Sequence, residues 1–469
     1  MSYQIPQHIS KDKVFIVNRS YIDNRLDTQY YSANLDLAGF VKLSSVAIVK
    51  GGKRIPKGYG YSDEVTPYHY LRVADMDSDA QVDVNKLMNI SEEVFNILGR
   101  YEIIEGELAI SIAGTIGKTT ILRNIPADKR VILTENCAKI LTKPNIELLP
   151  EYLRICLGLP IVKKQLDLNY IQTTIPKLGL DKIVSIKIPP IPSIQRQQEI
   201  VEYINTAYAQ KRAKETEAKK LLDSIDDYLL KELGIIIPKI KTDLNSRMFV
   251  VQKKDLKGRY TPSIYKDAVT LHSTIYENVP LSHLAYINPN TRIPNQNKEM
   301  PISFVPMESV NEIYAEITEH IDCFTEESKG FTRFQEGDLL WAKITPCMEN
   351  GKSAIAEGLT NGYGCGSTEF HVIRPKNDDL LIEYIHSILH MKLVRQTAKL
   401  YFGGSAGQQR VATDFLENFN VPLPSKVKQK EIVAYTADIR ARAKALQTEG
   451  KVILDNAKRK VEHSERALK

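Results

Sequence analysis

The chain lacks several features that would place it in common protein classes. Its 469 residues include 5 cysteines and 1 tryptophan, and the cysteines contain no C-x-x-C pair. An odd cysteine count without such pairs argues against a disulfide framework or a zinc site and fits a reducing compartment. No segment approaches the roughly 18 apolar residues of a membrane helix, and residues 1–13 lack the apolar core of a signal peptide. We therefore expect a soluble, cytoplasmic protein.

A strong charge imbalance is also missing. The 63 Lys and Arg residues oppose 57 Asp and Glu residues, which leaves a formal net charge of +6. This surplus alone does not indicate a nucleic-acid partner. Residues 426–469 are more basic, with 12 Lys or Arg against 6 Asp or Glu. A solvated helix face explains that surplus as well as a partner does.

No catalytic motif is complete. The segment 113–119 resembles a phosphate-binding loop, but Ile112 stands where that loop requires glycine. Its counterpart Gly351-Lys352 has Pro346 at the same place, so a strand–turn–strand hairpin is the better interpretation. His386 and His390 have zinc-ligand spacing on a helix, yet the catalytic glutamate and a third ligand are missing, which favours two surface histidines. Nuclease and amino-methyltransferase motifs are absent as well.

A tandem duplication organises the chain. Residues 191–201 and 423–433 read as copies, each with a Pro-Ser pair followed by Gln-x-Glu-Ile-Val. Residues 43–56 align with 281–294, and Gly117-Lys118 aligns with Gly351-Lys352. Five matches keep the same order at offsets of 231 to 238 residues. A repeat this long predicts two similar modules.

Each module is expected to be mixed α/β and largely antiparallel, because short apolar runs alternate with glycine, proline and a few helical patterns. A long charged helix follows each module: apolar residues recur every three or four positions in both, and Gly234 marks the first stop. The first helix would span about 38 residues, or about 57 Å, and Gly450 suggests a bend in the second. Such narrow apolar stripes need a partner, so the helices should pair as an antiparallel coiled-coil-like rod.

These patterns give a linear domain plan. The plan comprises a leading segment at 1–42, a first module at 43–193, a first helix at 194–234, a linker and leading segment at 235–280, a second module at 281–425 and a second helix at 426–469.

Several of these features together resemble the specificity subunits of Type I restriction–modification systems. The matching elements are the proline-rich strand ends, the Gln-x-Glu-Ile-Val helix openings, the Gly-Lys turns and the segment Ser367 to His371. The resemblance implies a non-catalytic subunit whose modules are target-recognition domains, each reading half of an asymmetric bipartite DNA site. The helices would set the spacer and dock two methyltransferase subunits. The complex would use S-adenosylmethionine, and also ATP and Mg²⁺ if restriction subunits join it.

Base reading and phosphate binding require Arg, Lys, Gln or hydroxyl side chains on loops. The candidates for DNA contact are Lys53, Arg54, Lys118, Tyr170, Gln172, Thr173, Thr174, Lys343, Lys352, Ser405, Gln408, Gln409 and Arg410. The candidates for helix pairing and partner docking are Gln197, Glu199, Ile200, Ile204, Gln429, Glu431 and Ile432. We expect neither a metal site nor catalytic residues.

Two other interpretations stay open at this stage. A protein-interaction scaffold would keep the rod but bind protein through both modules, and salt-dependent DNA affinity would distinguish it. A modification system without a nuclease would use the same specificity subunit with fewer partners. An enzyme with an unfamiliar site is disfavoured by the missing motifs.

Overall fold

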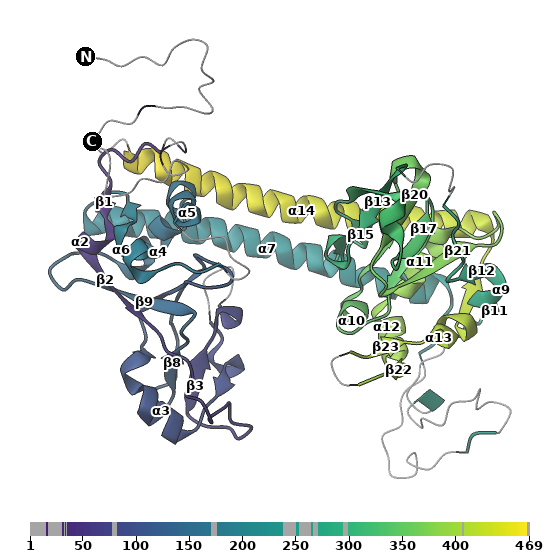
Figure 1. The fold of residues 1–469 in the computed structure, drawn as a ribbon, viewed down its shortest axis with the longest axis horizontal. Helices are drawn as coiled ribbons and strands as arrows, with labels where there is room; N and C mark the ends of the chain where they lie inside the picture. Colours follow the sequence, from purple (N-terminus) through teal and green to yellow (C-terminus); the bar gives the residue numbers. More distant parts are fainter. Residues whose placement is uncertain are drawn as a thin grey trace. The chain divides into compact units, whose positions relative to one another are not determined.

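The computed structural model describes residues 16, 31, 33, 35–76, 82–169, 176–237, 250–252, 264–265, 271–293, 299–405 and 408–466. The chain forms two compact units (Figure 1): residues 1–213 with 449–469, and residues 214–448. Each unit therefore takes one part of each long helix, which the linear plan of domains did not anticipate.

The described residues of the first unit form two four-stranded sheets and one strand pair. Its strands are β1 (Val41–Lys42), β2 (Ala47–Gly51), β3 (Tyr68–Leu71), β4 (Met88–Asn89), β5 (Glu102–Ile103), β6 (Leu108–Ser111), β7 (Thr119–Ile121), β8 (Arg130–Leu133), β9 (Cys137–Thr142) and β10 (Lys187–Ile188). One sheet has the order β2-β9-β6-β7 and the other β4-β3-β8-β5, while β1 pairs with β10. Only β3 and β8 run parallel among these pairs. The antiparallel β6–β7 pair is the hairpin expected at the Gly117-Lys118 segment.

The second unit repeats this topology. Its strands are β11 (Glu277–Pro280), β12 (Ala285–Ile287), β13 (Pro301–Val305), β14 (Val310–Asn311), β15 (Glu316–Ile317), β16 (Ile321–Phe324), β17 (Thr332–Gln335), β18 (Leu339–Ala342), β19 (Ser353–Ile355), β20 (Tyr363–Gly366), β21 (Phe370–Pro375), β22 (Phe402–Gly403), β23 (Arg410–Val411) and β24 (Asn420–Leu423). The orders β12-β21-β18-β19 and β16-β13-β20-β17 match those of the first unit, and β11–β24 corresponds to β1–β10. Again one pair in the second sheet, β13–β20, is parallel. The duplication is thus visible strand by strand.

Short helices follow the same repeat. They are α2 (Leu43–Val46), α3 (Glu92–Leu98), α4 (Pro150–Leu157), α5 (Pro160–Asp167), α6 (Leu180–Ser185), α9 (Leu281–Leu284), α10 (Cys347–Asn350), α11 (Ile382–His390), α12 (Lys392–Lys399) and α13 (Thr413–Asn418). The stretches 150–167 and 382–399 each form two consecutive helices. Pro160 has no N–H to give to a preceding turn, so it begins α5 instead of continuing α4. In the second unit the extended backbone of Met391 makes the break.

The two long helices are α7 (Ile194–Glu232) and α14 (Lys426–Arg466). Gly234 follows α7 with a φ of +59°, which confirms the predicted glycine stop. The bend expected at Gly450 is absent, because α14 is helical through that residue. A Cβ placed on Gly450 would lie 3.4 Å from the Cα of Lys211 on α7. The glycine therefore allows close approach of the two helices within the first unit.

Apolar residues of both helices belong to the cores of the units. In the first unit, Ile200 and Ile204 of α7 share a core with Leu454 of α14 and with Tyr152 of α4. In the second unit, Ile432 of α14 shares a core with Leu229 of α7, and Tyr228 stacks on Tyr435 with ring centroids 3.8 Å apart. The two helices therefore pair in antiparallel fashion, as expected.

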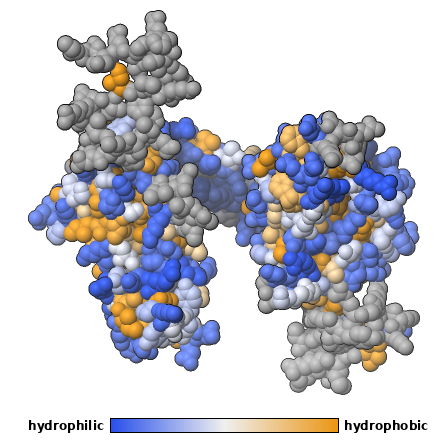
Figure 2. Space-filling model, viewed as in Figure 1, coloured by the Kyte–Doolittle hydropathy of each residue, from blue (hydrophilic) through white to orange (hydrophobic). Residues whose placement is uncertain are grey.

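The face drawn in Figure 2 is largely hydrophilic, with hydrophobic residues scattered among the polar ones. None of the helices in the described part of the chain is long and apolar enough to cross a membrane.

Candidate nucleic-acid interface

Four segments of the first unit meet at one end of its β2-β9-β6-β7 sheet. Gly52 donates its N–H to the carbonyl of Cys137 at 2.9 Å, and Ile112 donates to Asn136 at 2.8 Å. Leu178 donates in turn to the carbonyl of Ile112 at 2.8 Å. We call this surface, made of residues 52–54, 112–114, 134–137 and 176–178, the first edge.

The second unit has the equivalent surface. Asn288 donates its N–H to Val372 at 2.7 Å. Lys343 donates to Glu369 at 2.9 Å, and Val411 donates to the carbonyl of Lys343 at 2.9 Å. We call residues 288, 343–345, 367–371 and 408–411 the second edge. Backbone segments from distant parts of the sequence therefore bring their side chains to one place in each unit.

The first edge presents a positioned arginine. The Arg54 side chain is exposed, and its Nε donates to Glu135 in the turn between β8 and β9. Thr134 donates its hydroxyl to the same carboxylate at 2.8 Å. Burial opposes ionisation of Glu135, but the hydrogen bonds from Arg54 and Thr134 outweigh it and lower the pKa of this carboxyl. Lys53 lies beside this pair and is exposed.

The second edge holds a similar pair built from other segments. Arg410 of β23 donates from Nε and Nη2 to Glu369 at 2.8 and 2.7 Å, and from Nη1 to the carbonyl of Gln408 at 2.7 Å. The hydrogen bonds from Arg410 lower the pKa of the Glu369 carboxyl. Thr345 donates its N–H to the carbonyl of Gln409 at 3.0 Å. Lys343, Gln409 and Arg410 are thus brought together, as a shared recognition surface requires.

Lys118 and Lys352 do not lie on these edges. Lys118 directs its Nζ to the carbonyl of Met76, 3.3 Å away. Lys352 donates to the carbonyls of Met307 and Val310, both at 3.0 Å. Each lysine instead links its hairpin to the backbone beside the other sheet. Carbonyl oxygens engage their ammonium groups in the free chain, and phosphate binding by these two lysines stays a prediction.

Some candidates fall outside the described residues or lie exposed on a loop. Tyr170, Gln172, Thr173 and Thr174 lie outside the described part of the chain. Ser405 and Gln408 are exposed, and Gln408 donates its N–H to the carbonyl of Ser405 at 3.0 Å. Their role in DNA contact stays a prediction.

Sequence reasoning missed part of the first edge. Beside this edge in sequence, Tyr59 and Tyr61 are 41% and 47% exposed, and Lys57, which precedes both, is exposed as well. Lys177 makes a β-bridge to Ala113, where the second unit has the bridge between Arg410 and Ile344. Cations interleaved with aromatic rings favour nucleic-acid contact. The Gly-Tyr-Gly-Tyr sequence was the available signal.

The helix openings contain residues with structural rather than surface roles. Gln197 and Gln429 are 0% and 1% exposed, so the prediction that they contact a partner subunit is wrong. Ile200, Ile204 and Ile432 are also buried, within the unit cores. Glu199 and Glu431 are exposed; they pair with Arg196 at 3.0 Å and Lys428 at 3.1 Å. These two glutamates remain available for partner docking.

His386 is buried and His390 is half-buried, which corrects the expectation of two surface histidines. His386 is 3% exposed, and its Nε2 lies 3.0 Å from the Ser353 hydroxyl. The His390 Nδ1 lies 3.4 Å from the same hydroxyl. Burial, with the charge of Arg440, lowers the pKa of His386 to about 3. Among the described residues no group of His, Cys, Asp and Glu could hold a metal ion.

A duplicated α/β unit with a cationic edge in each copy and a long helix after each is the organisation of a tandem nucleic-acid recognition protein. The family model for the Type I restriction modification DNA specificity domain matches residues 38–224 and 275–450. These stretches cover more than half of the chain, and the chain belongs to this family.

Two curated relatives come from Escherichia coli. The specificity subunit of the type I restriction enzyme EcoEI is 38% identical over 159 residues, which are 34% of this chain and 26% of that protein. The EcoAI specificity subunit is 34% identical over 188 residues, 40% of this chain and 32% of that protein. The aligned stretches thus span about a third or less of each relative. A solved structure from work on assembly of the type I R-M system covers 91% of this chain and 95% of its own, at 16% identity and a TM-score of 0.46.

Proposed function

We propose that this chain is the DNA-specificity subunit of a Type I restriction–modification complex and that it reads an asymmetric bipartite site. The first edge reads one half of the site and the second edge reads the other. The observation that carries the proposal is that equivalent surfaces hold a glutamate-bound arginine supplied by different segments. Arg54 follows β2, whereas Arg410 belongs to β23.

This difference supports two unlike half-sites. In the first unit the position equivalent to Arg410 holds Lys177, which is exposed. In the second unit the sequence equivalent of Arg54 is Arg292, also exposed. Direct readout depends on which donor reaches which base edge. Edges with differently placed donors would select different bases, so a palindromic target is not expected.

The partners follow from the same proposal. Two methyltransferase subunits dock on the paired helices α7 and α14, and restriction subunits join when the system has them. S-adenosylmethionine is held by the methyltransferase subunits, and ATP and Mg²⁺ by restriction subunits. This chain supplies recognition and scaffolding and takes no part in the chemistry.

A salt titration tests the DNA-binding part of the proposal. The affinity of the complex for duplex DNA should fall steeply with salt. Its logarithm should decrease by about 0.9 for each phosphate contact when the salt concentration rises tenfold. The Arg54→Ala and Arg410→Ala variants should each lower that slope or relax specificity. An affinity for duplex DNA that does not depend on salt would favour the protein-scaffold alternative instead.

A further inference from the structure

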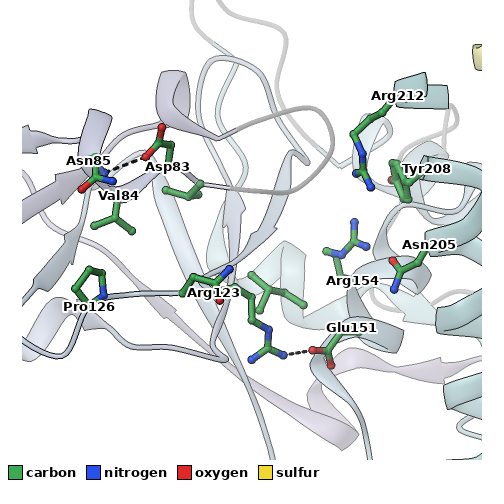
Figure 3. A pocket seen from close by; sticks show the side chains of 13 residues that line it. Asp83, Val84, Asn85, Arg123, Pro126, Glu151, Arg154, Asn205, Tyr208 and Arg212 are labelled. Atoms are coloured by element: carbon green, nitrogen blue, oxygen red, sulfur yellow. Dashed lines mark hydrogen bonds and ion pairs between the residues drawn. The ribbon is translucent and has the colours of Figure 1, made fainter. Parts of the chain in front are cut away.

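A cavity of about 600 Å³ lies in the first unit between the module and helix α7 (Figure 3). Its walls come from β7, α4, the segment around Val84, and one face of α7. Its charged lining residues are Asp83, Arg123, Glu151, Arg154 and Arg212. The recognition edges do not include any of these residues.

Charge inside this cavity is not balanced. Arg123 is paired with Glu151, as the dashed line in Figure 3 shows. Asp83 is paired with Lys86 at 3.2 Å. Among the described residues, neither Arg154 nor Arg212 has a hydrogen bond or an ion pair to a carboxylate, and both side chains extend into the cavity (Figure 3). Two guanidinium groups are therefore uncompensated.

Arg154 is the more unusual of the two because it is only 9% exposed. Its guanidinium carbon lies 5.3 Å from the centre of the Tyr208 ring, a contact that offers no hydrogen-bond acceptor. A second cation, Lys458 of α14, lies 5.5 Å from the same ring. A buried, positively charged group without an anion is costly, so this position is suited to an anion from outside the chain.

The second unit shows what this position looks like with the opposite charge. An equivalent cavity of about 380 Å³ is lined by Glu357 where the first unit has Arg123, and by His386 where it has Arg154. Arg440 lines it where the first unit has Tyr208, so this cavity holds one guanidinium group together with Glu357 and Glu383. Glu383 occupies the place of Glu151 and has no ion pair among the described residues. Burial and the neighbouring Glu383 raise the pKa of Glu357. Two carboxyl groups therefore accompany the single guanidinium group there, whereas in the first cavity the carboxylates of Asp83 and Glu151 are already paired and two arginines are not, so the first cavity is the better anion site.

We propose that the cavity of the first unit receives an acidic side chain of one methyltransferase subunit, held by Arg154 with Arg212 at the rim. This inference rests on the proposed function and adds that the two methyltransferase subunits are held unequally. Guanidinium groups bind carboxylates through two parallel hydrogen bonds, which suits a single Asp or Glu side chain.

The position of the cavity favours a protein carboxylate over a DNA phosphate. In the β6–β7 hairpin Leu108 pairs with Ile121, so Arg123 lies beyond the start of β6. The first edge includes residues 112–114, beyond the other end of that strand. DNA bound at the first edge would therefore meet the opposite end of the sheet. Helix α7, which supplies Asn205, Tyr208 and Arg212 to the cavity, is the element proposed to carry the methyltransferase.

The test compares methyltransferase binding to the full-length chain and its Arg154→Gln and Arg212→Gln variants by native mass spectrometry and titration. The cognate methyltransferase is the probe. One of the two binding steps should weaken about tenfold or more in each variant, which leaves complexes with one methyltransferase, while the other step stays unchanged. Arg100→Gln, which removes an exposed charge of the first unit outside the cavity, the first edge and the long helices, is the matched control and should bind two subunits.

A crosslink gives a second readout. In Arg154→Lys, a carbodiimide should couple the new amine to a carboxylate of the bound methyltransferase, and peptide mapping would identify that residue. Coupling to Glu151 alone would overturn the proposal. Thermal unfolding shows whether Arg154→Gln still folds, and Arg212→Gln, at the cavity rim, decides the question if it does not.

The remaining outcomes separate this inference from the proposed function. If the unaltered chain binds no methyltransferase, the proposed function fails and the cavity inference falls with it. If it binds two and both arginine variants also bind two with unchanged affinity, the cavity inference alone is overturned. Loss of DNA affinity by the free Arg154→Gln chain would identify the anion as a phosphate and would also overturn it.

Discussion

Gln197 and Gln429 lie 232 residues apart and make the same three hydrogen bonds, each at the first turn of a long helix. Gln197 accepts from the N–H of Leu149 at 2.9 Å and donates to the carbonyls of Glu147 and Pro192 at 2.7 and 2.9 Å. The corresponding distances for Gln429 are 2.9, 3.1 and 3.1 Å, to its own equivalents of these groups. Each amide thus ties a helix start to the module that precedes it.

This relationship predicts a large loss of stability for Gln429→Ala. Removing the amide leaves a buried N–H and two carbonyls without partners, which should lower the free energy of unfolding by about 1–3 kcal/mol. Trp341 is the single tryptophan and is buried in the second unit, so its fluorescence during urea unfolding reports on this unit. Lys430→Ala, at the exposed neighbouring position, should change stability by less than about 0.5 kcal/mol. Equal effects of the two substitutions would contradict the anchoring role.

The Glu369–Arg410 pair predicts a pH dependence of stability. The hydrogen bonds from Arg410 lower the pKa of Glu369 below its usual 4.5. The pair therefore stabilises the fold above that pH, and the contribution disappears as the pH falls through the lowered pKa. Because the Arg410 side chain is partly exposed, the contribution should be about 1 kcal/mol or less. Urea unfolding of the unaltered chain and Glu369→Gln, followed by Trp341 fluorescence, should differ at pH 7 and converge once the pH falls below the lowered pKa of Glu369. A difference that grows on acidification would have the wrong sign.

Lysines on and off the edges should respond differently to substitution. Lys352→Met breaks two hydrogen bonds to backbone carbonyls, so it should lower stability by about 1–3 kcal/mol and leave the salt dependence of DNA binding unchanged. Lys53→Ala should do the reverse. It should reduce the slope of the logarithm of DNA affinity against the logarithm of salt concentration by about 1, and leave the unfolding transition in place. A smaller salt dependence of DNA binding for Lys352→Met would identify Lys352 as a phosphate ligand.

Substitutions at the two edges should affect different halves of the target. Arg54→Ala should relax the base preference in one half-site, and Arg410→Ala in the other, with a loss of about 1–3 kcal/mol for each bidentate base contact. Selection of bound sequences from a random duplex library measures both preferences at once. Changes confined to the same half-site for both variants would refute the assignment of one edge to each half.

Charged side chains at the buried contact between α7 and α14 should disrupt the core of the first unit. Replacing Ile200 and Ile204 with glutamate places two carboxylates in the core of the first unit, where both isoleucines are buried. Such burial is strongly unfavourable, so hydrogen exchange of the first unit should increase sharply and methyltransferase assembly should fail. Ile97→Glu, at an exposed position of α3, is the matched control. Normal assembly by the double variant would disprove the helix-pair model.

The repeat and the architecture could be predicted from sequence because duplication leaves matched motifs even where the copies have diverged. The buried positions of the long helices, such as Ile200 and Ile432, followed from their spacing. For Lys118 and Lys352, sequence shows a lysine in a turn but not the carbonyl oxygens around its amine. The same limit hid the anchoring role of Gln197 and Gln429.

The edges illustrate a second limit. Each is assembled from four segments that are far apart in sequence, and pairs such as Arg54 with Glu135 become visible only when strands are placed in register. The cavity near Arg154 was invisible for the same reason, since its arginines come from β7, α4 and α7. Local patterns predict elements, but such sites depend on tertiary contacts.

The most direct test of the central claim is a base-resolution methylome of cells with and without this gene, with its cognate methyltransferase present in both. The account predicts a gene-dependent, non-palindromic split motif that carries N6-methyladenine in each half. If the complex is shown to assemble and no gene-dependent motif is found, this absence would contradict recognition by this chain and favour a protein scaffold.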